Sequence, residues 1–180
     1  KTKNAFERKD SHPHASCQAL FSQALDYARR GWRVLPLHTI EEDGTCSCRK
    51  PGCGSPGKHP LTKHGVNDAT TDEERIRDWW ERWPDANIGI LTGHLSRLLV
   101  LDIDPRHGGS LEALPPIPET APRVRTGGGG WHIYLAWPQG LDRLPKVLPG
   151  YQGVDLKGGG GYVVAPPSRH VSGEYTWATA

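Results

Sequence analysis

One segment constrains the fold of this 180-residue chain more than any other: the apolar run Leu98-Leu99-Val100-Leu101 continues into Asp102-Ile103-Asp104. Successive side chains of a β-strand point to opposite faces, so Asp102 and Asp104 share one face while the intervening apolar residues are buried on the other. Two carboxylates this close repel each other unless a cation lies between them. Hard divalent ions such as Mg²⁺ or Mn²⁺ prefer these oxygen ligands. The run predicts a buried strand with a metal site at its end, although a lone acid pair is more often a solvated strand end that begins a turn.

A glycine-rich turn precedes a second predicted strand, residues 131–137, which carries His132 near its start. Glycines let backbone N–H groups approach an anion closely, and two arginines just before the turn add positive charge. The pattern predicts a phosphate site, whose candidate ligands are Arg125, Gly128, Gly129 and Gly130. The alternative is a flexible hairpin with a structural histidine.

A third segment, residues 153–157, places Asp155 between apolar neighbours and is followed by Lys157 and a second glycine run, 158–161. A single acid in a strand is often only a surface residue. The order of the three segments, an acid pair, a glycine turn with a histidine strand and a later acid, is more specific than any one of them.

Residues 39–64 form an insertion that is rich in Gly, Pro, Cys and Lys and too long to be an ordinary connection. Its pattern Cys46-x-Cys48-x4-Cys53-x5-His59 offers three thiolates and an imidazole, the ligand set of a closed structural zinc site. We predict a zinc-binding insertion at about residues 40–64 with these four ligands. Free thiols in a disordered loop and His64 in place of His59 are the alternatives.

The insertion is also basic, because it contains Arg49, Lys50, Lys58 and Lys63. These side chains indicate either contact with the phosphates of a nucleic acid or nucleotide, or simply a solvated loop. The whole chain has 22 Lys and Arg against 20 Asp and Glu, so a nucleic-acid site must be a local patch.

Helical spacing of small and apolar residues predicts a first helix over residues 16–30, after a polar segment, 1–15, that we expect to be flexible. Thr71 and Glu74 fit the capping box of a second helix. Ile76, Trp79, Trp80 and Trp83 follow at helical spacing, which favours core packing over a base-stacking platform. Further strands are predicted at 32–37, 87–91 and 162–165. Helices early and strands late predict an α+β fold with a largely antiparallel sheet.

No apolar run reaches the roughly 20 residues of a membrane span, and no signal-peptide pattern opens the chain. We therefore expect a cytoplasmic protein without a membrane partner, folded as one unit over residues 16–180.

Together the three motifs resemble the primase-polymerase (Prim-Pol) family of the archaeo-eukaryotic primase superfamily, which occurs in plasmids, phages and mobile elements. That family has an acid-x-acid motif, a motif ending in histidine and a motif built on one acid, matched here by Asp102 and Asp104, His132 and Asp155. Residues 65–93 and 163–168 also resemble it. The second motif commonly has a serine two residues before the histidine, and this chain has Gly130 there.

The resemblance implies a DNA primase/polymerase that transfers nucleotides from NTPs or dNTPs to a 3′-hydroxyl on a single-stranded DNA template. Asp102, Asp104 and Asp155 would hold two Mg²⁺ or Mn²⁺ ions, and His132 would contact the triphosphate. Lys157, Arg125 and the glycine-rich backbone are weaker candidates for that contact. The implied fold is an RRM-like antiparallel catalytic sheet with flanking helices beside a smaller α/β unit. A helicase or accessory domain after residue 180 and a prokaryotic host cell are further expectations.

Two other functions fit the same residues. Acids with a histidine also serve metal-dependent phosphodiesterases and nucleases, where water replaces the 3′-hydroxyl. A non-catalytic, zinc-containing DNA-binding module is the second alternative. The preference for NTPs or dNTPs is open at this point.

Overall fold

The computed structural model describes residues 15–140 and 144–178, so the expected flexible segment 1–15 lies outside the described residues except for Ala15. The helices are α1 (Ala15–Arg29) and α2 (Glu73–Arg82), with short 3-10 turns η1 (Gly65–Asp68) and η2 (Pro105–His107). The strands are β1 (Val34–Leu37), β2 (Asn87–Leu91), β3 (Leu98–Ile103), β4 (Arg123–Arg125), β5 (Trp131–Ala136), β6 (Val154–Lys157), β7 (Tyr162–Ala165), β8 (Arg169–His170), β9 (Gly173–Glu174) and β10 (Thr176–Trp177).

Both predicted helices form, but the capping residue of α2 differs from the expectation. Asp72, not Thr71, is the N-cap, and its carboxylate accepts hydrogen bonds from the backbone N–H groups of Glu74 (3.0 Å) and Arg75 (3.3 Å). An Asp carboxylate satisfies these free donors as well as a Thr hydroxyl would. Trp79 and Trp80 are buried, which confirms the prediction of core packing for this helix face.

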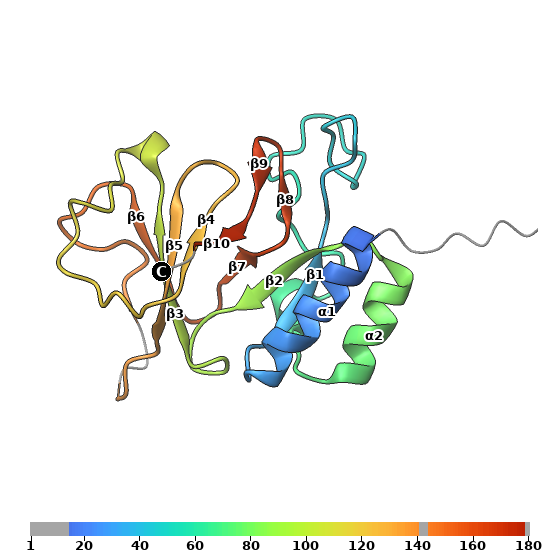
Figure 1. Ribbon diagram of the computed structural model, residues 1–180, viewed down its shortest axis with the longest axis horizontal. Coiled ribbons are helices and arrows are strands. Elements are labelled where there is room, and N and C mark those ends of the chain that lie inside the picture. The colour runs from blue at the N-terminus through green and yellow to red at the C-terminus, as the bar shows by residue number, and fades with distance from the viewer. Residues whose placement is uncertain (1–14, 141–143, 179–180) are drawn as a thin grey trace, which may run out of the picture.

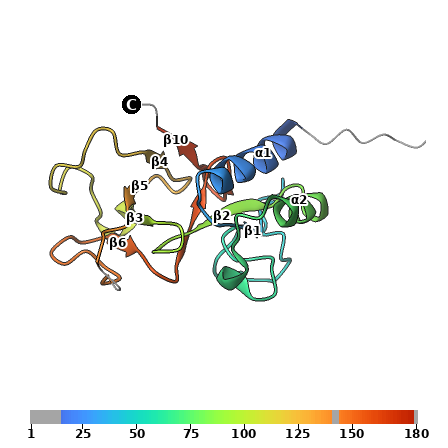
Figure 2. The same ribbon diagram turned by 90° about the horizontal axis from the view of Figure 1, so that it is seen from below.

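The smaller sheet has the strand order β1-β2-β7, and both of its interfaces are antiparallel. Every residue of β1 and β2 is buried. Figure 1 shows α1 and α2 side by side next to β1 and β2, at the opposite end of the molecule from β6, and Figure 2 shows the same separation from below. The helices therefore cover this three-stranded sheet and form a small α/β unit with it.

The larger sheet has five strands in the order β10-β4-β5-β3-β6, again with antiparallel pairing throughout. The two faces of β3 enter different hydrophobic cores. Leu98 and Val100 pack into the core shared with the helices, whereas the alternate residues Leu99, Leu101 and Ile103 pack into a second core. Asp102 thus continues the face of Val100, as strand alternation predicts.

The α+β class with antiparallel sheets agrees with the expectation from sequence. The insertion leaves the sheets after β1 and returns to β1 through a single bridge, Leu37 to Pro60, while a second bridge, Ile40 to Cys46, lies within the insertion itself. The strands β4, β8, β9 and β10 were not predicted; they are only two or three residues long and lack clear alternation. Among the described helices, none is long and apolar enough to cross a membrane.

Candidate active site and zinc site

Three of the predicted site residues form one row across the larger sheet. Asp102 on β3 pairs with His132 on β5 at one side and with Asp155 on β6 at the other. Directly opposed residues in antiparallel strands share a face, with their Cβ atoms about 4.5–5.5 Å apart. The imidazole Nε2 of His132 lies 3.5 Å from Oδ1 of Asp102, and the ring is almost fully buried. The register therefore brings the three motifs together.

Lys157 lies between two of these acids. Its ammonium is 2.8 Å from Oδ2 of Asp155 and 3.3 Å from Oδ2 of Asp102. Burial opposes ionisation of Asp102, but His132 and Lys157 outweigh it and lower the pKa of this carboxyl. Burial also disfavours the charged form of Lys157, yet the two carboxylates raise the pKa of its ammonium. An ammonium thus supplies the cation that a close acid pair needs.

Asp104 follows the end of β3 and caps η2. Its carboxylate accepts from the backbone N–H of Arg106 (2.9 Å) and from the Arg106 guanidinium (2.7 Å), and it lies 3.1 Å from Nδ1 of His107. The hydrogen bond from the Arg106 side chain is the main reason that the pKa of Asp104 is held well below its usual range. Asp104 is therefore ionised and paired with a cation.

These groups line a cleft of about 290 Å³. Three of the four predicted catalytic residues line it, namely Asp102, Asp104 and His132, whereas Asp155 lies beside it in the sheet row. Cations, glycines, aromatic side chains and a threonine hydroxyl form most of the remaining wall. They include Lys58, Arg106, Lys157, His170, Thr126, Gly128, Gly130, Tyr162 and Tyr175.

The structure does not bring Arg125 or Gly129 to the wall of this cleft. Arg125 pairs in register with Trp131, one residue before His132, so its side chain projects from the other face of the sheet. There its guanidinium lies 4.8 Å from the centre of the Trp131 ring.

The glycine turn approaches β3 so closely that Gly130 has no room for a side chain. A Cβ atom at Gly130 would lie 2.3 Å from the carbonyl oxygen of Ile103. The serine that the second Prim-Pol motif commonly has at this position therefore does not fit this backbone. The hydroxyl of Thr126 accepts a 2.9 Å hydrogen bond from Gly130 N–H and lines the cleft, so the turn still offers a hydroxyl.

Several cleft residues were not assigned to the site from sequence. Lys58 comes from the insertion, where it is one of four basic residues. Burial lowers the pKa of its ammonium, and so does the positive charge of Arg106. His170 and Tyr175 come from the segment around β8 and β9, and the Tyr175 ring centre lies 5.8 Å from that of His132. Only the three-dimensional path of the chain links this segment to the acids.

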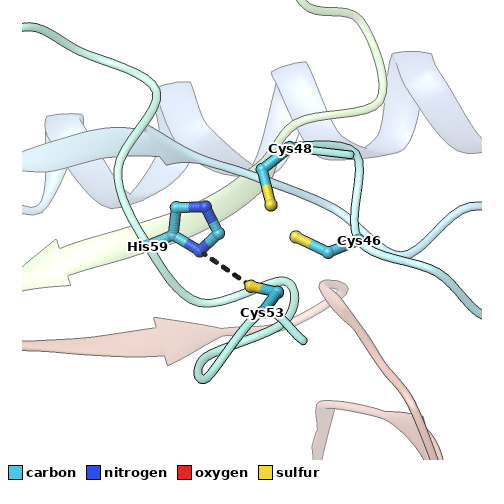
Figure 3. A group of neighbouring side chains, drawn as sticks. All are labelled: Cys46, Cys48, Cys53 and His59. Atoms are coloured by element: carbon cyan, nitrogen blue, oxygen red, sulfur yellow. Dashed lines mark hydrogen bonds between the residues drawn. The ribbon is translucent and has the colours of Figure 1, made fainter. Parts of the chain in front are cut away.

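The four predicted zinc ligands converge, as Figure 3 shows. One ligand atom from each of Cys46, Cys48, Cys53 and His59 lies within 4.8 Å of the other three. A tetrahedral Zn²⁺ with bonds of ~2.3 Å needs ligand atoms about 3.8 Å apart, so small adjustments would close the site. His64 lies elsewhere, with Nδ1 3.2 Å from Asp68. Of the metal-ligand side chains in the described ranges, this is the one group of three or more that gathers so closely, and it could hold zinc.

The thiols differ in their surroundings. Cys46 is buried, which raises the pKa of its thiol, and its sulfur accepts from Gly57 N–H at 3.4 Å. A hydrogen bond from the backbone of Lys50 lowers the pKa of Cys48 to about 7. The three cysteines are free thiols rather than disulfides.

This geometry is that of a protein in which acids on an antiparallel sheet face a cationic, glycine-rich cleft. The family described as "Bifunctional DNA primase/polymerase, N-terminal", or Prim-Pol, matches residues 24–180. The chain belongs to this family, and at the family level its activity is nucleotidyl transfer of the primase/polymerase type. No curated protein matches the chain.

Proposed function

We propose that this chain is the catalytic domain of a DNA primase/polymerase, which transfers nucleotides from NTPs or dNTPs to a 3′-hydroxyl on a single-stranded DNA template. The observation that carries the proposal is the row Asp155, Asp102 and His132 beside a cationic, glycine-lined cleft, in a chain of the Prim-Pol family. The five-stranded sheet would be the RRM-like catalytic sheet of this family.

The acids suit divalent cations because Asp102 and Asp104 have lowered pKa values and Asp155 is the register partner of Asp102. These three carboxylates would hold two Mg²⁺ or Mn²⁺ ions. When bound, the ions would activate the 3′-hydroxyl and neutralise charge on the departing pyrophosphate.

Lys157 and Arg106 already neutralise these carboxylates, so they compete with a divalent ion for the same oxygens. Once released, both side chains would still lie at the cleft, where a nucleotide triphosphate brings compensating negative charge. We propose that the cleft exchanges acid–cation pairs for metal and phosphate contacts when substrate binds.

The phosphates would lie against the glycine turn. Gly128 and Gly130 line the cleft without side chains, and Thr126 adds a hydroxyl. His132 would contact the triphosphate with the same ring edge that faces Asp102. The Cys46, Cys48, Cys53 and His59 group would hold a structural zinc.

Primer synthesis and primer extension on single-stranded DNA, with Mg²⁺ or Mn²⁺, test the proposal directly. We expect incorporation of nucleotides by the wild-type chain and its loss in Asp102→Asn and Asp155→Asn. Asp26→Asn is the matched control, because Asp26 lies on the exposed surface of α1, where it pairs with Arg29. Parallel assays with NTPs and dNTPs determine the preferred substrate.

Two outcomes would replace this proposal with another function. Strand cleavage without incorporation would indicate a phosphodiesterase or nuclease. DNA binding that needs no metal and leads to no turnover would indicate a binding module.

A further inference from the structure

Lys58 connects the insertion to the cleft. It immediately precedes His59 of the metal-ligand group, and its side chain lines the same cleft as Asp102 and Asp104. It is close enough for the charges of Arg106 and of both acids to act on it. A residue of the insertion therefore reaches the candidate active site.

Lys58 differs from Lys157 and Arg106, because in the described part of the chain it forms no direct ion pair with a carboxylate. Lys157 pairs with two carboxylates and Arg106 pairs with Asp104. Within the described ranges, no carboxylate forms an ion pair with the Lys58 ammonium at 4.0 Å or less. A half-buried ammonium without a direct ion pair favours binding of an anion.

The backbone around Lys58 is held firmly. Its carbonyl oxygen accepts a 2.7 Å hydrogen bond from the hydroxyl of Tyr162, which also lines the cleft. The preceding residue, Gly57, donates to the sulfur of Cys46 and accepts a 2.8 Å bond from the buried amide of Asn87. Two metal ligands thus adjoin Lys58. His59 follows it in the sequence, and Cys46 contacts the residue before it.

The other three cations of the insertion differ from Lys58. Arg49, Lys50 and Lys63 are exposed, and none of them lines the cleft. The geometry therefore selects one basic residue of the loop for a role at the site and leaves the others to solvent.

From these contacts we infer that Lys58 binds a phosphate group of the incoming nucleotide, and that the Cys46, Cys48, Cys53 and His59 group holds Lys58 in place. Metal occupancy of that group then sets the affinity for nucleotide. A template phosphate offers the same chemistry, but the position of Lys58 in the cleft with Asp102 and the glycine turn favours the triphosphate. This inference rests on the proposed function for the identity of the ligand.

The test measures binding of dATP in the presence of Ca²⁺ by calorimetry, which needs no catalysis. Loss of one charge-assisted contact should weaken dATP binding about tenfold in Lys58→Met, and Lys58→Arg should retain most of the affinity. Lys50→Met is the matched control and should bind dATP like the wild type. Zinc content and melting temperature are measured for each variant, and we expect both to be unchanged.

A second comparison tests the coupling to metal. Removal of zinc from the wild-type chain with a chelator should weaken dATP binding by about the same factor as Lys58→Met. Removal from Lys58→Met should cause little further loss, because two changes that act through one contact are not additive.

Several results would overturn the inference. If Lys58→Met binds dATP as tightly as the wild type, Lys58 does not contact the nucleotide. If this variant also binds a single-stranded oligonucleotide more weakly, Lys58 contacts the template instead. Additive losses, or unfolding of the whole chain upon chelation, would show that the metal does not act through Lys58. A chain that binds dATP through Lys58 but incorporates no nucleotide would contradict only the proposed function.

Discussion

The ammonium of Lys157 lies 2.8 Å from the carboxylate of Asp155, and the same ammonium is 3.3 Å from Asp102. In Lys157→Met the two carboxylates face each other without a cation, so the metal-free chain should lose stability and gain affinity for Mn²⁺. Because the ion pairs of Lys157 are partly exposed, we expect the free energy of unfolding to fall by about 1 kcal/mol or less. The same energy corresponds to up to about fivefold tighter Mn²⁺ binding. Mn²⁺ titration followed by electron paramagnetic resonance measures this. Lys146→Met, an exposed neighbour of β6, should change neither property.

His132 gives a second prediction, because its Nε2 faces Asp102 at the edge of the cleft. If the ring stabilises phosphate charge, His132→Ala should raise the KM for nucleotide and reduce kcat/KM about ten- to a hundredfold. Tyr134→Phe is the control on the same strand face, since the Tyr134 hydroxyl is buried without a hydrogen bond among the described residues. A lower melting temperature of His132→Ala with unchanged KM would mean that the histidine supports the fold.

The tight contact at Gly130 predicts a strong effect of a single methyl group. In Gly130→Ala the new Cβ meets the carbonyl oxygen of Ile103, so the turn must move away from β3. We expect a loss of roughly 1–3 kcal/mol in the free energy of unfolding, the usual cost of overpacking. Gly128→Ala is the comparison, because its Cβ would meet only the edge of His170 at 3.6 Å. Equal urea midpoints for the two variants would contradict the close approach.

Metal analysis tests the zinc site and the choice between two histidines. Protein purified without chelator should contain one Zn²⁺ per chain, and His59→Ala should lose most of it. His64→Ala should keep its zinc, because His64 pairs with Asp68 away from the cysteines. X-ray absorption should give Zn–S distances near ~2.3 Å. Zinc-free wild-type protein would refute the site.

Asp68 predicts a pH dependence that is separate from the active site. Its carboxylate accepts from the backbone N–H of His64 (2.9 Å) and from Arg75 (3.0 Å), and the His64 bond is the main cause that lowers its pKa to about 2. A lowered pKa stabilises the fold fully above the unfolded pKa of about 3.9, and this contribution disappears as the pH falls through about 2. Asp68→Asn should therefore be less stable than wild type at pH 7, and the difference should shrink between pH 4 and pH 2. Urea unfolding across this range measures it, and a constant difference would contradict the assignment.

Some of the site could be predicted from local patterns and some could not. Strand alternation alone put Asp102 on the face opposite Leu101, and ligand identity alone grouped the cysteines. Spacing could not choose between His59 and His64, since that depends on how the chain folds back on itself. The same limit applies to Arg125. It lies one residue along β4 from the position opposite His132, so its side chain projects from the other face of the sheet.

The remaining cleft residues are brought to the site by contacts between segments that are far apart in the sequence. His170 and Tyr175 carry no local pattern that relates them to Asp102, and they reach the cleft only because β7 returns the chain to the smaller sheet. The predicted N-cap of α2 was wrong for a different reason, because Thr71 and Asp72 are adjacent and both suit that position.

The strands β3 and β5 each contribute side chains to both hydrophobic cores, as Val100 and Leu101 do on β3 and Tyr134 and Ile133 do on β5. A change of volume in either core is therefore transmitted to Asp102 or His132 through a single backbone. Natural variants of this domain should consequently diverge freely in their loops and helix surfaces, while these two strands tolerate mainly exchanges that are compensated in both cores at once. The centre of the larger sheet would then evolve most slowly even at positions that never touch a substrate.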